Sequence, residues 1–297
     1  MQTTTVQPPR KMKVQRGDLG ADHSVQALTP YKVIGVILLL ILAFLFLFPL
    51  YWIITGSFKS QQVINAATPQ WFPLEPTLSN YQRLFEKPAM TWVWNTVFMC
   101  IMSMALTCVT ASMGGYALAK KRFAGNKLIF SVFIIAMALP KQVILIPLLK
   151  EMAWLGIHNT LWAVILPTVG WPFGVFLMKQ FSEGIPGEML EAAKIDGAGE
   201  IRTFTSVVVP LIKPGIGALA IFTFINSWND YFMQLIMLTS SSKLTISLGI
   251  ATMQAENSTD FGLIMAGAAL AAVPIIIVFL LFQKYFTKGI TMGAVKG

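Results

Sequence analysis

The chemically reactive side chains of this 297-residue chain are few and scattered. Two cysteines, two histidines and 13 acidic residues are the main groups that could act as nucleophiles, general bases or metal ligands. His23 and His158 stand alone in the sequence, so they predict no metal site. No G-x-x-x-x-G-K-[ST] phosphate loop is present, so we do not expect the chain to hydrolyse ATP by itself. The sequence predicts no enzyme, no bound metal and no cofactor.

One charged stretch stands between two strongly apolar regions. It reads EAAKIDGAGEIRTFTSVVVPLIKP and runs from residue 191 to residue 214. We expect a short helix over Glu188–Ile195, because acidic residues in the first turn complement the helix dipole. Gly197 can adopt the left-handed conformation that ends such a helix. A second short helix is expected over Glu200–Val208, after which two prolines should redirect the chain: Pro210 and Pro214.

The first of these helices has a face with almost no side-chain bulk. That face consists of Ala192, Ala193, Gly197 and Ala198. A surface of this kind can enter a groove on another protein. Two acidic side chains beside it could then meet basic groups there: Glu191 and Asp196.

The composition indicates where the rest of the chain resides. Hydrophobic residues make up 55% of it and charged residues only 12%, whereas soluble domains average about 25% charged residues. A bilayer core roughly 30 Å thick requires about 20 apolar residues of helix. We therefore predict an all-α, polytopic membrane protein with six spans. Their expected ranges are 33–54, 89–119, 128–139, 154–178, 215–238 and 261–282, with a short non-spanning return at 144–149.

Charge predicts how these spans are oriented. Six spans place both termini on one side, and that side then holds 16 of the 22 basic residues. Basic loops remain in the cytoplasm during insertion, so both ends and the charged stretch are expected there. The net charge of +9 follows from this asymmetry and from an anionic inner leaflet, so no nucleic-acid partner is expected.

The domain organisation is simple. Residues 1–31 form a basic cytoplasmic tail that is polar and expected to be disordered. Residues 32–297 form one transmembrane domain, within which residues 183–214 are the charged loop. Gly170, Pro167 and Pro172 are expected to allow kinks in the fourth span.

Polar and aromatic side chains gather in the predicted fifth span. The segment NSWNDYFMQ supplies Asn226, Trp228, Asn229, Asp230, Tyr231 and Gln234. Polar groups at membrane depth face protein or water rather than lipid. Aromatic faces combined with amides and hydroxyls bind neutral sugars, so these residues are candidates for a substrate path. Close packing without substrate contact is the alternative.

The charged stretch resembles the EAA loop of ABC-importer permeases. The shared pattern is Glu-Ala-Ala, three residues, Gly197, nine residues, and then Val207-x-Val209-Pro210. Two valines stand where that family usually has Ile and Leu. Further segments are similar to the maltose-type carbohydrate importers, over roughly residues 33–297: LGIHNT, LPTVGWPFGVFLMKQF, IPGEMLEAAKIDGA, FINSWNDYF and KGITMGAVKG.

This resemblance implies a set of partners in a bacterial inner membrane. It implies a second permease subunit of six to eight spans, two copies of a cytoplasmic ATP-binding subunit, and an extracellular or periplasmic sugar-binding protein. The ATP-binding subunits would dock on the loop through Glu191, Ala192, Ala193, Asp196, Gly197, Ala198 and Pro210. Membrane lipid surrounds the spans.

Two other classes of protein were weighed against an importer subunit. A stand-alone secondary carrier for a small polar solute would be expected to show ion-coupling groups or repeated halves, and only Asp230 lies within a predicted span. A membrane scaffold would not need the charged, small-residue loop. The sequence favours the permease subunit of a sugar importer.

Overall fold

A computed structural model describes residues 30–256 and 259–294. The chain divides into two compact units, residues 1–47 and residues 48–297. In the first unit the described residues form the beginning of α1 (Pro30–Ser57), which carries no charge after Lys32. The predicted cytoplasmic tail, residues 1–31, lies almost entirely outside the described residues, and so do the two chain ends.

Within the described ranges every regular element is helical, as predicted. Five helices there are long and apolar enough to cross a membrane, and a bent pair can count as a sixth span. The five are α1, α4 (Ala89–Lys120), the stretch Trp162–Glu183, the stretch Glu200–Asn229, and the first 23 residues of α14 (Phe261–Ala294). The bent pair is α5 (Asn126–Met137) with α6 (Lys141–Trp154).

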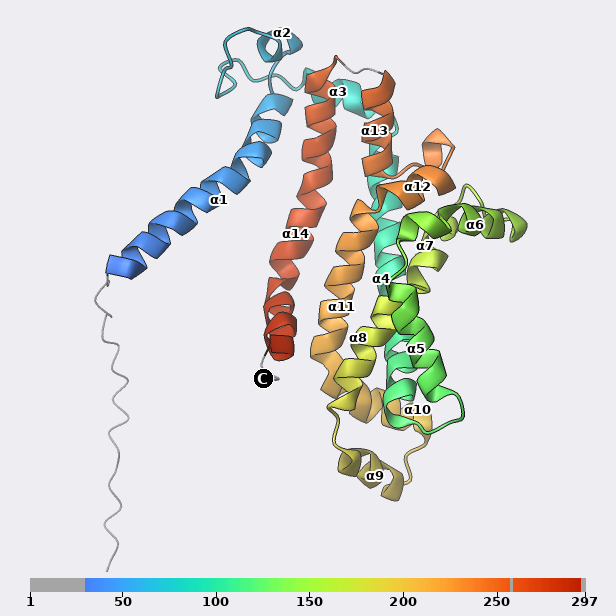
Figure 1. The fold of residues 1–297 in the computed structure, drawn as a ribbon. Coiled ribbons are helices and arrows are strands. Elements are labelled where there is room, and N and C mark those ends of the chain that lie inside the picture. The colour runs from blue at the N-terminus through green and yellow to red at the C-terminus, as the bar shows by residue number, and fades with distance from the viewer. Residues whose placement is uncertain (1–29, 257–258, 295–297) are drawn as a thin grey trace, which may run out of the picture. The chain divides into compact units, whose positions relative to one another are not determined.

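Shorter helices connect these spans. They are α2 (Gln61–Ile64), α3 (Ser79–Glu86), α9 (Gly187–Ile195), α12 (Tyr231–Met237), α13 (Ile246–Glu256) and a 3₁₀ turn at Ser241–Lys243. Within the second unit, α9 lies at one end of the long helices, and α3 and α13 lie at the other end (Figure 1).

Helix α4 is the centre of the second unit. It packs along α8 (Pro172–Glu183) and α11 (Val209–Asn229), and also against α7 (Trp162–Val169). The backbones of α4 and α8 approach each other at Gly115, where an added Cβ would lie 2.6 Å from the backbone nitrogen of Lys179. Only glycine permits two helix backbones to approach so closely at this point.

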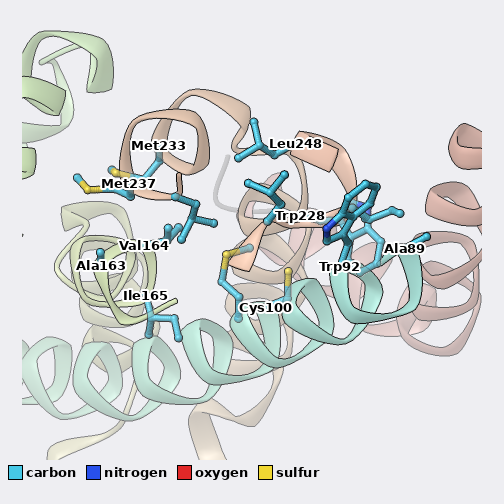
Figure 2. Close-up of a cluster of buried hydrophobic side chains, with 14 of the residues drawn as sticks. Ala89, Trp92, Cys100, Ala163, Val164, Ile165, Trp228, Met233, Met237 and Leu248 are labelled. Atoms are coloured by element: carbon cyan, nitrogen blue, oxygen red, sulfur yellow. The ribbon is translucent and has the colours of Figure 1, made fainter. Parts of the chain in front are cut away.

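Buried apolar side chains from several of these helices form the larger core cluster. Figure 2 shows this cluster against α4, with Trp228 among the labelled side chains. Trp228 is 3% exposed, and its ring stacks on Phe224 with centroids 5.7 Å apart. The end of α11 is thereby fixed to the helices around it.

The fourth span begins later than the sequence indicates. We expected it over residues 154–178, but Trp154 ends α6 and the span occupies Trp162–Glu183. The reason is a turn with two left-handed residues, Gly156 (φ 70°) and Asn159 (φ 59°), which separates the two helices. The predicted break near Gly170 and Pro172 is confirmed, since α7 ends at Val169 and α8 begins at Pro172.

The fifth span is also shifted, and the prolines before it do not redirect the chain. Helix α10 (Glu200–Thr203), a π-helical turn (Phe204–Val208) and α11 run on as one helix. A proline ring clashes with the carbonyl four residues earlier, and the wider π turn provides a way to accommodate Pro210. The span ends at Asn229 rather than at residue 238, so Trp228 lies in its last turn and not deep within it.

Candidate functional site

The EAA segment folds into a helix closed by a glycine. Helix α9 ends at Ile195, and Gly197 has a φ of 74°. The Ala198 amide donates to the Ala193 carbonyl at 2.9 Å, and the Gly197 amide donates to the Lys194 carbonyl at 3.0 Å. This pair of hydrogen bonds is the Schellman motif, which requires the left-handed residue and so explains the glycine.

A hollow of about 370 Å³ lies between α9 and the start of the next helix. Four of the predicted docking residues line it: Ala192, Ala193, Asp196 and Ala198. The rest of the lining was not predicted as part of the docking site and consists of Met189, Arg202, Ser206 and Val207. Glu191 and Gly197 are exposed beside it, whereas Pro210 lies farther along the helix. Three of the four residues of the predicted small-residue face, Ala192, Ala193 and Ala198, therefore line a concave surface, and Gly197 does not.

Two isoleucines beside this hollow face outward. Ile195 is 86% exposed and Ile201 is 82% exposed. Both lie in a charged segment that the sequence places outside the membrane, where large apolar side chains are unfavourable without a covering surface. Sequence reasoning missed them, although an isoleucine beside Asp196 and another between Glu200 and Arg202 are signals that could have been used.

The last residue of α4 and the one after it attach both ends of the loop. Lys120 Nζ donates to the carbonyls of Glu183 (3.0 Å) and Ile185 (2.6 Å) before α9. Lys121 forms a salt bridge with Glu200 after α9. The hydrogen bond with Glu200 raises the pKa of Lys121 above its ordinary value, so the ammonium is retained. Both limbs of the loop are thus tied to one helix end.

A second group of polar residues surrounds the end of α11. Asn226 and Asn229 are exposed, and their side-chain amides donate to the carbonyls of Phe222 (2.8 Å) and Ile225 (2.9 Å). Asp230 is the single residue between α11 and α12, and its Oδ1 accepts from the Met233 amide at 3.3 Å. Tyr231 opens α12 and is 36% exposed.

Two of the path candidates are buried in the protein's own interior. Trp228 belongs to the core described above, which favours the packing alternative for this side chain. Gln234 is fully buried, donates to the Ser227 carbonyl at 3.0 Å and accepts from Thr245 Oγ1. Both side chains pack inside the protein at the end of α11. The exposed candidates are Asn226, Asn229 and Tyr231, and Asp230 is partly buried.

Sequence reasoning also missed a cation beside this group. Lys141, which lies between the predicted third and fourth spans, places its Nζ 3.4 Å from Asp230 Oδ2 and 4.8 Å from the centroid of the Trp171 ring. These residues are 30 to 89 positions apart in the chain. No local pattern could have paired them.

Known proteins share this architecture. A bacterial ABC transporter that imports the acidic polysaccharide alginate has a solved structure whose chain matches 86% of this chain and 96% of its own, with a TM-score of 0.75 at 24% identity. The arabinooligosaccharides transport system permease protein of Halalkalibacterium halodurans is 35% identical over 260 residues, which are 86% of this chain and 93% of that protein. The maltodextrin transport system permease protein of Bacillus subtilis is 32% identical over 270 residues, 90% and 96% of the respective chains.

The family match covers both groups of candidate site residues. The model of the binding-protein-dependent transport system inner membrane component matches residues 111–292, which include the EAA loop and the end of α11. The resemblance seen in the sequence is confirmed. This chain belongs to the family of inner-membrane components of binding-protein-dependent transport systems.

Proposed function

We propose that this chain is one permease subunit of an ABC importer for a sugar or oligosaccharide. It forms half of the translocation path, and α9 with the turn after it receives a separate ATP-binding subunit. Both chain ends and the α9 loop lie in the cytoplasm, consistent with the distribution of basic residues in the sequence.

The pair of exposed isoleucines beside the hollow carries the docking part of this proposal. Ile195 and Ile201 present apolar surface at the tip of the second unit, next to the small side chains of the EAA segment. Hot spots of protein interfaces are large side chains that become fully desolvated on binding. A partner that covers both isoleucines would therefore gain most of its binding energy here.

The substrate class is supported by the relatives and by the side chains at the end of α11. The two curated relatives described above are named for arabinooligosaccharides and maltodextrin. Asn226, Asn229 and Tyr231 supply exposed amides and an aromatic ring near Asp230. Amides and aromatic faces are suited to carbohydrate, which presents hydroxyl groups on one surface and C–H groups on another.

The family implies the remaining partners. A binding-protein-dependent system needs a binding protein that delivers substrate, and we place it at the end of the second unit that carries α3 and α13. A second permease subunit completes the path, and two ATP-binding subunits serve the two permeases. The outward apolar faces of the spans, including α5 with no buried residue, contact lipid or this second permease.

ATP binding would then move the spans as rigid bodies. Closure of the ATP-binding pair draws the two permease loops together, and each loop carries the helices joined to it. The α8 limb and the α10 limb are both tied to α4 through Lys120 and Lys121. Motion of the ATPase is therefore passed to three helices together.

The docking surface is tested by polar substitution of the isoleucines. Ile195→Gln and Ile201→Gln, each in the complete complex, should weaken association with the ATP-binding subunit roughly 10- to 100-fold, the effect of losing one buried isoleucine contact. Leu74→Gln is the matched control, because Leu74 is 80% exposed in the loop at the opposite end. Unchanged co-purification and ATP hydrolysis in both isoleucine variants would contradict the docking assignment.

The transport function is tested with the reconstituted complex in proteoliposomes and a sugar panel. The panel contains two uncharged members, arabino-oligosaccharides and maltodextrins, and one acidic member, alginate oligosaccharides. We expect uptake of at least one member that requires ATP and the binding protein. Uptake by this chain alone, driven by an ion gradient, would instead indicate a secondary carrier.

A further inference from the structure

Three junctions between consecutive helices meet at one ammonium group. Lys141 is the first residue of α6, directly after the 108° bend that separates α5 from α6. Its Nζ contacts Asp230, where α11 gives way to α12, and the ring of Trp171, where α7 gives way to α8. Lys141 therefore links the break in its own helix pair to the breaks in two others.

A small hollow of about 60 Å³ adjoins this junction. Its polar lining comes from four helices or their ends: Thr107, Lys141, Thr168, Trp171, Thr223 and Asn226. The apolar part of its wall includes Phe173 and Phe222, whose ring centroids are 4.3 Å apart. The space accommodates a few water molecules or hydroxyl groups, and it does not accommodate a whole sugar ring.

One hydroxyl group in this wall has no hydrogen-bond partner. Thr107 is 3% exposed, and its buried Oγ1 contacts no donor or acceptor. Thr110 on the same helix and Thr168 in the same wall instead donate to carbonyls one turn earlier, both at 2.8 Å. Thr107 is one of five side chains in the described part of the chain whose buried hydroxyl lacks a partner, and it is the one of the five that lines the hollow, so it is a candidate for pairing with a group that enters there.

The Lys141–Asp230 pair has donor and acceptor sites beyond those used in its own contact. Its 3.4 Å separation exceeds the roughly 2.7–2.9 Å of a well-formed charged hydrogen bond, and the two side chains are 34% and 17% exposed. An ammonium donates and a carboxylate accepts, so two neighbouring hydroxyls can bind together, one accepting from Lys141 and the other donating to Asp230. The Trp171 ring lies beside this pair, with the Lys141 ammonium over it.

Charge balance decides which sugar suits this arrangement. The pair carries no net charge, so an uncharged sugar meets both groups favourably. A carboxylate on the sugar would be attracted to Lys141 but repelled by Asp230 at close range. The pair therefore disfavours acidic sugars relative to uncharged ones.

We propose that Lys141 and Asp230, together with the adjoining hollow, form a subsite in this chain that binds the hydroxyl groups of an uncharged sugar and selects against acidic ones. This inference rests on the proposed function and adds to it a direct substrate contact by this subunit. The hydroxyls at one edge of the sugar occupy the hollow, and the ring lies outside it.

The test compares two charge-neutralising variants with a matched control. Lys141→Gln keeps most of the stem beside Trp171, and Asp230→Asn keeps a side-chain oxygen that can accept from the Met233 amide. Lys150→Gln is the control, because Lys150 is an exposed lysine on the same helix that does not line the hollow. Binding of an arabino-oligosaccharide and of an alginate oligosaccharide is measured on the purified, assembled complex without binding protein, and uptake is measured in proteoliposomes.

The two variants should change selectivity in opposite directions. Each should weaken binding of the uncharged sugar roughly three- to tenfold, as expected for one lost hydrogen bond. Asp230→Asn should raise the ratio of acidic to uncharged sugar bound, and Lys141→Gln should lower it. A merely structural pair would not give opposite changes, so a ratio that stays constant or changes in one direction for both variants overturns the subsite.

Failure of the subsite is distinguishable from failure of the proposed function. A wild-type complex that imports an uncharged sugar, with variants that bind and import like the control, overturns the subsite alone. A wild-type complex that assembles yet imports no member of the panel contradicts the proposed function itself.

Discussion

The Lys120 ammonium donates a 2.6 Å hydrogen bond to the Ile185 carbonyl, which joins the end of α4 to the residues that enter α9. The next residue, Lys121, pairs with Glu200 on the far limb of the same loop. Two consecutive residues at one helix end thus hold two segments of chain that are separated by α9, the proposed docking surface.

Loss of both ammonium groups should uncouple the loop from the membrane helices. In the variant Lys120→Gln/Lys121→Gln we expect the ATP-binding subunit still to bind, because the isoleucines and the hollow are untouched. Stimulation of ATP hydrolysis by loaded binding protein should fall, because the loop loses the hydrogen bonds and the salt bridge that attach its two limbs to the end of α4. Lys127→Gln, an exposed lysine at the start of α5, is the control. Normal stimulation in the double variant would show that the two lysines do not transmit the motion.

Gly197 should not tolerate a branched side chain. Its φ of 74° costs an L-residue about 1–2 kcal/mol, although an added Cβ would meet no atom within 4 Å. Gly197→Val should therefore distort the turn after α9 and reduce co-purification of the ATP-binding subunit, with membrane insertion unchanged. Insertion is checked by membrane fractionation and association by pull-down.

Gly199→Val provides the comparison for that variant. Gly199 has an ordinary φ of −67°, and an added Cβ there also meets nothing within 4 Å. We expect it to retain the ATP-binding subunit. Equal losses in the two variants would point to crowding of the partner's groove and not to backbone conformation.

Trp228 should matter for stability more than for transport. Its indole is 3% exposed in the core cluster, so Trp228→Ala should lower the stability of the complex by about 3–5 kcal/mol. Trp228→Phe should lower the stability less, because phenylalanine retains an aromatic ring against Phe224. Thermal unfolding by fluorescence-detected gel filtration gives the stability, and uptake is normalised to folded complex. Reduced normalised uptake with unchanged stability would return Trp228 to the substrate path.

The two ends of the second unit should face opposite sides of the membrane. In a background in which Cys100 and Cys108 are replaced by alanine, single cysteines at Asp196 and Ser241 should react with an impermeant maleimide from opposite faces. Asp196 follows α9, and Ser241 begins the 3₁₀ turn that leads into α13. The basic residues predict that Asp196 is labelled from the cytoplasm. Labelling of both positions from one face would refute the layout of spans.

Local chemistry was predictable from the sequence, and long-range pairing was not. Helix α9, the left-handed Gly197 and the interruption near Gly170 and Pro172 each depend on residues within one turn of one another. The start of the fourth span was wrong because Gly156 and the left-handed Asn159 were not recognised as a turn. Propensity does not reveal that an asparagine will adopt a positive φ.

The prolines of the fifth span show a different limit. Pro210 and Pro214 are ordinary helix breakers, yet the helix continues from Glu200 to Asn229 with a π turn just before Pro210. Packing of Val208 and Ile212 in a buried cluster holds this helix together. Lys141 is a similar case, because its partners depend on three separate helix breaks meeting in space.

The unbroken course of that helix has a mechanical consequence. Its 30 residues correspond to about 45 Å at 1.5 Å per residue, with Glu200 beside the docking surface at one end and Asp230 directly after the other. The π turn at Phe204–Val208 and the two prolines, Pro210 and Pro214, lie near the Glu200 end, and from residue 215 to residue 229 the helix contains no proline and no break. By the same geometry, a tilt of about 10° at the cytoplasmic end displaces the far end by about 8 Å. In the proposed importer, a tilt of this helix on nucleotide binding would move Asp230 relative to Lys141 directly, as one rigid displacement.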